Sequence, residues 1–167
     1  MDIAISQFFF SLRSLDRTAF FKVATSLGDL KTIGILFILV AGILVYNRNY
    51  RYLKAFVIAL AVSEPITYIG KIVFHRARPL NALLTETDYS FPSGHATIAV
   101  AFYGFIAIML MKKQVSKNLR IVIALVAILI ILLIGISRLY LGVHYFTDVI
   151  AGFVIGSLGV LIGMTFL

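Results

Sequence analysis

Three short segments of the chain hold polar residues of the kinds that bind or attack a phosphate group. The first contains Lys71 and Arg78, and the second contains Ser93, Gly94 and His95. Lys71 and Arg78 are seven residues apart, which is two helical turns, so on a helix both cations project from one face. Ser93 and Gly94, just before an apolar run, are typical of a helix N-terminus, whose unpaired N–H groups bind anions. These two segments therefore offer cations and backbone donors to one anion.

The third segment contains Arg138, His144 and Asp148. His144 and Asp148 are four residues apart, so on a helix their side chains would be neighbours. Asp148 would then accept the Nδ1 proton of His144 and leave Nε2 free to act as a nucleophile. Arg138 lies six residues before His144, which is off that face of a continuous helix. We therefore expect a break near Gly142 that lets the two side chains converge.

Together the segments supply three fixed cations, a helix N-terminus, two histidines and one carboxylate. This set suits a tetrahedral oxyanion whose charge is held while a nucleophile attacks in line. It does not suit a divalent metal ion, because three cations surround a single carboxylate. The chain has no cysteine, which excludes disulfides and thiolate ligands. We expect neither a metal nor a cofactor.

The composition indicates which elements position these residues. The 167 residues are 61% hydrophobic, with a mean hydropathy of +1.03, which is too apolar for a soluble domain of this size. Five apolar runs approach the ~20 residues that a membrane-spanning helix needs. They are Leu30–Tyr46, Leu53–Phe74, Ala96–Met111, Leu119–Ser137 and Val149–Leu167. We predict an all-α membrane bundle of about five transmembrane helices, forming one domain over residues 1–167.

Residues 1–29 have a different pattern from the bundle of residues 30–167. Charged residues interrupt their apolar positions too often for a span, yet the apolar positions still recur near helical spacing. This favours one or two amphipathic helices in the membrane interface, with a sixth span as the alternative. The N-terminus has no basic region before its apolar stretch, so we do not expect a cleaved signal peptide.

The net charge of +8 is distributed as in a membrane protein rather than as in a nucleic-acid-binding protein. Seven basic residues and no acidic residue lie in segments 46–54 and 112–120, between apolar runs. Such loops face the cytoplasm. By alternation, segments 75–95 and 138–148 lie on the outer side together with the N-terminus. All three polar segments therefore fall on the periplasmic or extracellular side, and a bacterial inner membrane is the expected location.

The motifs Lys-x6-Arg-Pro, Pro-Ser-Gly-His and Ser-Arg-x5-His-x3-Asp resemble the three signatures of the type 2 phosphatidic acid phosphatase (PAP2) superfamily. All eleven specified residues are present in order between Lys71 and Asp148. The resemblance implies a bacterial membrane lipid phosphatase similar to phosphatidylglycerophosphate phosphatases or lipid A 1-phosphatases. Many membrane members have six spans, which differs from the five expected here. The connection Leu80–Ser90 is short, so we expect no large cap over the pocket.

The resemblance also implies a role for each matching residue. His144 would attack phosphorus and form a phosphohistidine, and Asp148 would orient it. His95 would protonate the leaving alcohol and later activate water. The phosphate oxygens would be held by Lys71, Arg78, Ser93, Gly94 and Arg138. Members of the family need no metal for this reaction.

A few residues outside the motifs are further candidates. Glu64 lies mid-span, seven residues before Lys71. It either lines the substrate cavity or pairs with Lys71, or else it forms a structural hydrogen bond between helices. His75 lies near the Lys71 face and is a candidate cavity-lining residue, whereas we expect Arg76 to point away toward lipid headgroups. The aromatic residues that border the motifs are expected at the pocket mouth: Tyr89, Phe91, Tyr140 and Tyr145.

The expected activity is hydrolysis of a lipid phosphomonoester or diphosphate. Candidate substrates are phosphatidylglycerophosphate, lipid A 1-phosphate, undecaprenyl diphosphate and phosphatidic acid, and the sequence does not choose among them. One alternative is phosphoryl or headgroup transfer at the same site. The other is a small transporter, although only Glu64 lies at the depth that transport requires. The expected partners are the lipid substrate, phosphate and the bilayer, with neither nucleic acid nor an obligate protein partner.

Overall fold

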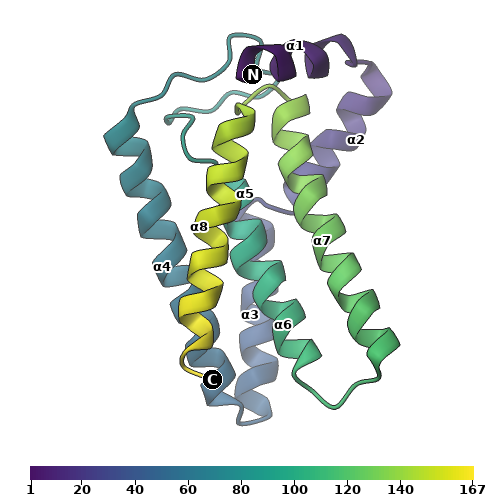
Figure 1. The fold of residues 1–167 in the computed structure, drawn as a ribbon, viewed down its shortest axis with the longest axis vertical. Coiled ribbons are helices and arrows are strands. Elements are labelled where there is room, and N and C mark those ends of the chain that lie inside the picture. Colours follow the sequence, from purple (N-terminus) through teal and green to yellow (C-terminus); the bar gives the residue numbers. More distant parts are fainter.

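The apolar runs fold into a bundle of helices without strands in the computed structural model, which describes all 167 residues (Figure 1). The predicted all-α class is therefore confirmed. The elements in chain order are α1 (Asp2–Ser11), α2 (Leu15–Ser26), α3 (Leu30–Tyr46), α4 (Tyr50–Phe74), α5 (Gly94–Ala99), the π-helical turn η1 (Val100–Gly104), α6 (Phe105–Met111), α7 (Lys117–Tyr140) and α8 (Phe146–Met164).

Four helices are long and apolar enough to cross a membrane. These are α4, the continuous helix formed by α5, η1 and α6, and the helices α7 and α8. A fifth span results if α2 and α3, which meet at a bend of 42°, are taken as one broken helix. The predicted number of about five spans is confirmed. The predicted span Leu30–Tyr46 coincides with α3, which is 17 residues long.

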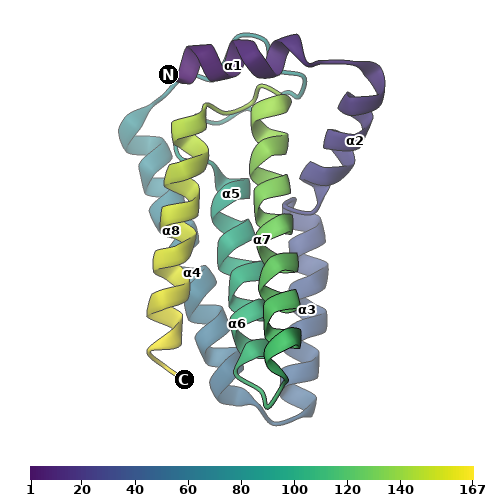
Figure 2. The ribbon, with the colours of Figure 1, turned by 45° about the vertical axis from the view of Figure 1, so that its right-hand side comes forward.

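The N-terminal segment contains two helices that run in different directions. Figure 2 shows α1 lying across one end of the bundle, whereas α2 descends beside α7 and leads into α3. One or two helices were expected in the membrane interface, and only α1 has the crosswise direction that such a location requires. Its depth in a bilayer stays a prediction.

Helix α4 ends earlier than the motif spacing implied. His75 adopts a left-handed conformation, with φ of 45°, and its N–H donates to the carbonyl of Lys71. The chain therefore leaves the helix after Phe74. Arg78 lies four residues beyond that end, so the expectation that Lys71 and Arg78 share a helical face was wrong. The two side chains still meet, as described below, because the connection after α4 folds back over the end of the bundle.

Glycines on α8 let this helix pack closely against α4 and α5. A Cβ atom added at Gly152 would lie 2.6 Å from the carbonyl oxygen of Ser93, and one at Gly156 would lie 2.5 Å from that of Thr97. Gly159 and Gly163 face α4 in the same way. Small residues at such an interface allow the backbones to approach, and packing then holds the helices together. This close contact brings the start of α8 beside the start of α5.

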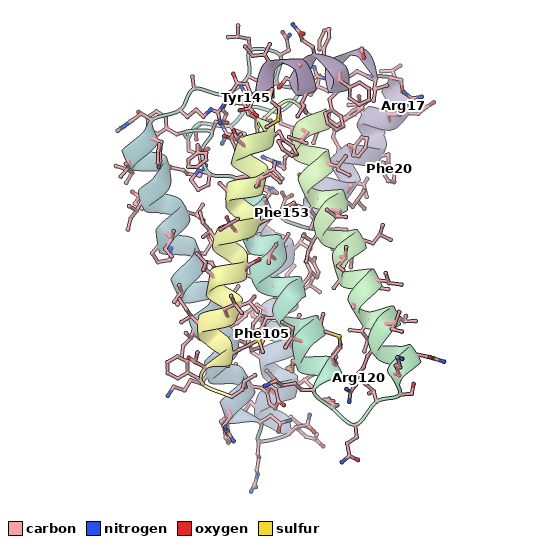
Figure 3. The ribbon with its side chains drawn as sticks, in the orientation of Figure 1. Arg17, Phe20, Phe105, Arg120, Tyr145 and Phe153 are labelled. Carbon is pink, nitrogen blue, oxygen red and sulfur yellow. The ribbon has the colours of Figure 1, made fainter.

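The basic segments and the candidate site segments lie at different ends of the bundle. The segments around residues 46–54 and 112–120 lie at the end that holds the C-terminus, and the candidate site segments lie at the other end, beneath α1 (Figure 1). In Figure 3, Arg120 marks the first end and Tyr145 the second. The basic segments and the candidate site segments thus lie at opposite ends of the bundle, as the charge pattern predicted. Which end faces the cytoplasm stays a prediction.

The glycine contacts predict that two Gly→Ala variants differ in thermal stability. In Gly159→Ala the new methyl would lie 1.9 Å from Ser63 Oγ and 2.5 Å from the carbonyl oxygen of Ala59, which forces α8 away from α4. Overpacking of this kind costs about 1–3 kcal/mol, so we expect a clearly lower melting temperature by circular dichroism in detergent. Gly42→Ala is the matched control, because nothing lies within 4 Å of the added atom. Equal melting temperatures for the two variants would contradict the packing described here.

Candidate active site

His144 lies in the connection between α7 and α8, not on a helix. Helix α7 ends at Tyr140, Gly142 has a positive φ of 69°, and α8 begins at Phe146. The predicted break near Gly142 is therefore confirmed. The prediction that His144 and Asp148 lie on one helix was wrong, because His144 precedes the first residue of α8. The backbone N–H of Tyr145 donates to Asp148 Oδ2 at 2.8 Å, and this contact starts α8 after His144.

The two side chains nevertheless meet. His144 Nδ1 lies 3.5 Å from Asp148 Oδ2, and both side chains are buried. Such a distance is at the limit of a hydrogen bond, and catalytic contacts of this kind are often long before substrate binds. Ser90 Oγ donates to the same carboxylate oxygen at 2.5 Å. Ser90 was missed from the sequence, although it directly precedes the Phe-Pro-Ser-Gly-His segment.

Arg76 provides the cation for Asp148. Its Nη1 donates to Asp148 Oδ1 at 2.5 Å, so the expectation that Arg76 points away toward headgroups was wrong. The cause is the end of α4 at Phe74, since a side chain beyond that point no longer follows the helical face. The fully buried Asp148 carboxylate thus receives donors from Arg76, Ser90 and Tyr145 in addition to its contact with His144.

The other ring nitrogen of His144 faces Arg78. Arg78 Nη1 lies 3.2 Å from His144 Nε2 and donates to the carbonyl oxygen of Val143 at 2.7 Å. Burial lowers the pKa of His144 to about 4, and the nearby charges of Arg138 and Arg78 add to the lowering that Asp148 opposes. The imidazole is therefore neutral at physiological pH. A neutral imidazole with Nε2 beside a cation is equipped to attack an electrophile bound to that cation.

The predicted phosphate-binding cations converge on carboxylates of the 80–90 connection. Lys71 Nζ lies 2.9 Å from Asp88 Oδ2, and Arg78 pairs with the other oxygen of the same carboxylate. Arg138 pairs with Glu86. Burial alone would raise the pKa values of Glu86 and Asp88, but hydrogen bonds from these cations outweigh burial and lower both. The two acidic residues were missed from the sequence, although they lie between the first and second motifs.

Arg138 is held from inside the bundle. Its side chain is almost fully buried, and Nη1 donates to Thr25 Oγ1 of α2 at 2.9 Å. Its Nε has no hydrogen-bond partner, and it is the one buried side-chain polar atom in the chain without a partner. Buried donors are nearly always paired, so an unpaired one marks a place for an acceptor.

His95 occupies the first turn of α5 and faces the N-terminal segment. Its Nε2 lies 2.8 Å from Oδ1 of Asp29, the residue at the bend between α2 and α3. Ser93 is the N-cap of α5, as predicted, and its Oγ accepts the N–H of Ala96. The backbone N–H of Ser93 donates to the carbonyl oxygen of Asp148 at 3.0 Å, which fixes the Ser93–Gly94 turn against the start of α8. Asp29 was missed because only the fold brings it to His95.

Two further candidates do not come to this site. Glu64 is exposed on α4, forms no hydrogen bond or ion pair, and lines a shallow cavity with Phe37 and Pro65. Its expected pairing with Lys71 is absent, because Lys71 pairs with Asp88. His75 is exposed and contacts the ring of Tyr89 edge-on, with ring centroids 4.6 Å apart.

The aromatic residues expected at the pocket mouth differ in their placement. Tyr140 is buried and bonds to Ser14 near α2, whereas Tyr145 packs beneath the guanidinium of Arg76 at 4.2 Å. Tyr89 is partly exposed, and Phe91 packs on Phe74 with ring centroids 4.8 Å apart.

Comparison with known sequences connects this chain with one family. The sequence model of the PAP2 superfamily matches residues 52–167. Phosphatidylglycerophosphatase B of Bacillus subtilis is 36% identical over 127 residues, which cover 74% of this chain and 62% of that protein. An undecaprenyl-diphosphatase of Sulfolobus acidocaldarius is 33% identical over 122 residues, which cover 69% of this chain and 55% of that protein. The matched part is thus less than two thirds of the length of either relative.

Solved structures extend the likeness to the whole chain. A crystal structure of a transmembrane PAP2 type phosphatidylglycerolphosphate phosphatase from Bacillus subtilis superposes with a TM-score of 0.83 at 31% identity. The superposition covers 99% of this chain and 82% of that one. The crystal structure of Aquifex aeolicus LpxE gives a TM-score of 0.80 at 23% identity, covering 98% of this chain and 94% of that one, and shows a shared fold. The N-terminal helices outside residues 52–167 therefore also have counterparts in known structures.

The pairing of Asp88 with two cations predicts a competition with added anions. In Asp88→Asn, Lys71 and Arg78 lose their carboxylate, so orthovanadate or inorganic phosphate should bind more tightly. The gain should reach at most about fivefold, since a partly exposed ion pair contributes up to ~1 kcal/mol. Isothermal titration calorimetry in detergent would measure it. Asp16→Asn is the control for net charge, because Asp16 is exposed and forms no ion pair. Weaker anion binding by Asp88→Asn would contradict the competition.

Proposed function

This chain belongs to the PAP2 superfamily, and from that premise we propose that it is an integral membrane lipid phosphatase with His144 as its nucleophile. The observation that carries the proposal is the buried, neutral His144 between the Asp148 carboxylate and the Arg78 cation. The reaction is hydrolysis of a lipid phosphomonoester or diphosphate through a phosphohistidine.

In the proposed reaction each ring nitrogen of His144 has its own task. Nδ1 faces Asp148, which fixes the tautomer and stabilises the charge that develops on the ring. Nε2 faces Arg78, where a bound phosphate oxygen would place phosphorus within reach. Attack forms the N–P bond while the P–O bond to the lipid breaks. His95 gives its proton to the leaving oxygen. It then takes a proton from the water that hydrolyses the phosphohistidine.

The cations and the start of α5 hold the phosphate oxygens. Arg138 Nε is buried, unpaired and adjacent to the cluster, so it is available to an oxygen acceptor without losing another bond. Lys71 and Arg78 exchange Asp88 for the phosphate, and Arg138 exchanges Glu86. The N–H group of Gly94 completes the cradle at the positive end of a helix. No step in this scheme requires a metal ion.

The relatives narrow the substrate to lipids that carry phosphate. The protein at 36% identity is a phosphatidylglycerophosphatase and that at 33% identity is an undecaprenyl-diphosphatase, so a glycerophospholipid monoester and a polyprenyl diphosphate are the first candidates. Phosphatidic acid and lipid A 1-phosphate complete the panel. The basic loops at the opposite end of the bundle support a site on the outer side of a bacterial inner membrane.

Phosphate release from this panel tests the proposal. We expect wild type to release phosphate from at least one lipid, with and without a chelator. His144→Ala should lower the rate by at least about a thousandfold, because no other group forms the covalent intermediate. A phosphorus label retained on the wild-type protein after a rapid quench, and absent from His144→Ala, would identify the phosphohistidine.

Two results would contradict the mechanism. One is activity that survives in a folded His144→Ala variant, with folding checked by its helical melting curve. The other is strict dependence on added magnesium, which would require a metal-assisted reaction. Product analysis in the presence of an alcohol separates hydrolysis from phosphoryl transfer, since a transferase would form the phosphorylated alcohol.

The lowered pKa of His144 predicts the pH at which its ring gains a proton. The chain has three histidines, so His75→Gln/His95→Gln leaves His144 as the only imidazole to be followed by NMR. Its pKa of about 4 lies below the ordinary value, so the ring should stay neutral as the pH falls through 6.5 and gain its proton only near pH 4. A midpoint near 6.5 would show that His144 is neither buried nor flanked by cations as described.

A further inference from the structure

Arg76 joins the N-terminal helix to the Asp148 carboxylate. Its Nη1 donates to Asp148 Oδ1 at 2.5 Å and to Thr147 Oγ1 at 2.7 Å, and its Nη2 donates to Asp2 Oδ2 at 2.7 Å. The Tyr145 ring supports the guanidinium from below, 4.2 Å away. The Arg76 side chain is thus fixed by three groups besides Asp148.

Asp2 of α1 is fixed equally well. Its Oδ1 accepts the backbone N–H of Thr147 at 3.1 Å, and its Oδ2 accepts the Thr147 hydroxyl at 2.6 Å. Because Thr147 lies in the first turn of α8, the carboxylate satisfies an N–H group that the helix itself leaves free, at the positive end of its dipole. Burial opposes ionisation of Asp2, but these hydrogen bonds and Arg76 lower its pKa, so it is a carboxylate at neutral pH.

The other end of α1 is anchored beside the same loops. Arg13 Nε donates to the carbonyl oxygen of Tyr140 at 3.1 Å, and its Nη1 donates to that of Asn81 at 2.7 Å. Helix α1 is therefore attached at Asp2 to the start of α8 and at Arg13 to the end of α7. It spans the connection that carries His144 (Figure 2).

We propose that Asp2 and Arg76 are positioning residues that act through Asp148 on the nucleophile His144. This inference rests on the proposed function. Arg76 holds Oδ1 and thereby turns Oδ2 toward His144, and Asp2 holds Arg76 in that place. Neither residue touches the phosphate. Helix α1, outside the part of the chain that matches the family model, thus completes the catalytic site.

The charge of Arg76 has a second effect. An unscreened carboxylate beside an imidazole favours its protonated form, which cannot attack. Arg76 neutralises part of the Asp148 charge, so Asp148 orients the ring while leaving it neutral. The other charges that act on His144 are Arg138 of α7 and Arg78 of the connection after α4. These two cations pair with Glu86 and Asp88, and Asp2 of α1 pairs with Arg76.

The test compares kcat, KM and their pH profiles for Arg76→Gln, Arg76→Lys, Asp2→Asn and the double variant Asp2→Asn/Arg76→Gln. The substrate is the panel lipid that wild type cleaves fastest. We expect Arg76→Gln to lower kcat about 10- to 100-fold with little change in KM, as misplacement of a reacting group does. Its acid limb of kcat/KM should move to higher pH, and Arg76→Lys should restore part of the rate.

Asp2→Asn should lower kcat by about tenfold or less, without moving the acid limb to higher pH, since Arg76 keeps its charge beside Asp148. The double variant should be no slower than Arg76→Gln alone, because Asp2 acts through Arg76. Additive losses would overturn the proposal. So would an unchanged acid limb in Arg76→Gln, because a residue that only anchors α1 would lower stability and leave the pH profile in place.

A readout without turnover separates this inference from the proposed function. In the His75→Gln/His95→Gln background, Arg76→Gln should raise the NMR titration midpoint of His144, and an unchanged midpoint would overturn the inference. If wild type cleaves no lipid of the panel, the proposed function fails, whereas this titration still tests the contact. Arg120→Gln and Asp16→Asn are the charge-matched controls, because both residues are exposed and unpaired, and neither should change rate or midpoint.

Discussion

The arrangement of this end of the bundle depends on the buried carboxylate of Asp148, whose charge must be surrounded by hydrogen-bond donors. A charge without exposed surface is costly unless donors surround it. Those donors come from four places in the chain: the guanidinium of Arg76, the hydroxyl of Ser90, the backbone of Tyr145 and the ring of His144. The connection after α4, the start of α8 and the turn at Gly142 must all be in place before Asp148 is satisfied. Assembly of the site therefore depends on how these segments pack against one another.

The packing of α8 makes this convergence possible. Its glycines allow the backbone to approach α4 and α5 to distances that any side chain would prevent. The carbonyl oxygen of Ser93 lies in that contact, opposite Gly152, and the N–H of Ser93 reaches the carbonyl oxygen of Asp148. The same interface thus fixes the helix that carries Asp148 and the turn that would bind phosphate. A looser interface would separate the proposed nucleophile from the proposed phosphate cradle without changing any residue of either.

The sequence predicted correctly those features that depend on residues close together in the chain. The spans follow from apolar runs, the cap at Ser93 from its position before such a run, and the break at Gly142 from the spacing of Arg138 and His144. The predictions failed where the chain leaves a helix and enters a connection. The left-handed residue after Phe74 ended the helix on which Lys71 and Arg78 had been placed on one face, with Arg76 pointing away from it. Partners such as Asp29 for His95, or Asp2 for Thr147 across 145 positions, have no local signal and require the tertiary fold.

Ion pairing explains how four cations are stable together at one end of an apolar bundle. Lys71, Arg76, Arg78 and Arg138 are matched by Asp2, Glu86, Asp88 and Asp148, so the cluster carries four charges of each sign. Two of the four carboxylates, Glu86 and Asp88, belong to the short connection and are partly exposed, whereas Asp148 is fully buried. A phosphate monoester carries about −1.5 to −2 at neutral pH, close to the charge of the two exposed carboxylates together. In the proposed reaction, substrate binding is therefore an exchange of anions at constant net charge. The pair formed by the buried Asp148 and the partly exposed Arg76 is left unchanged while Lys71, Arg78 and Arg138 change partners.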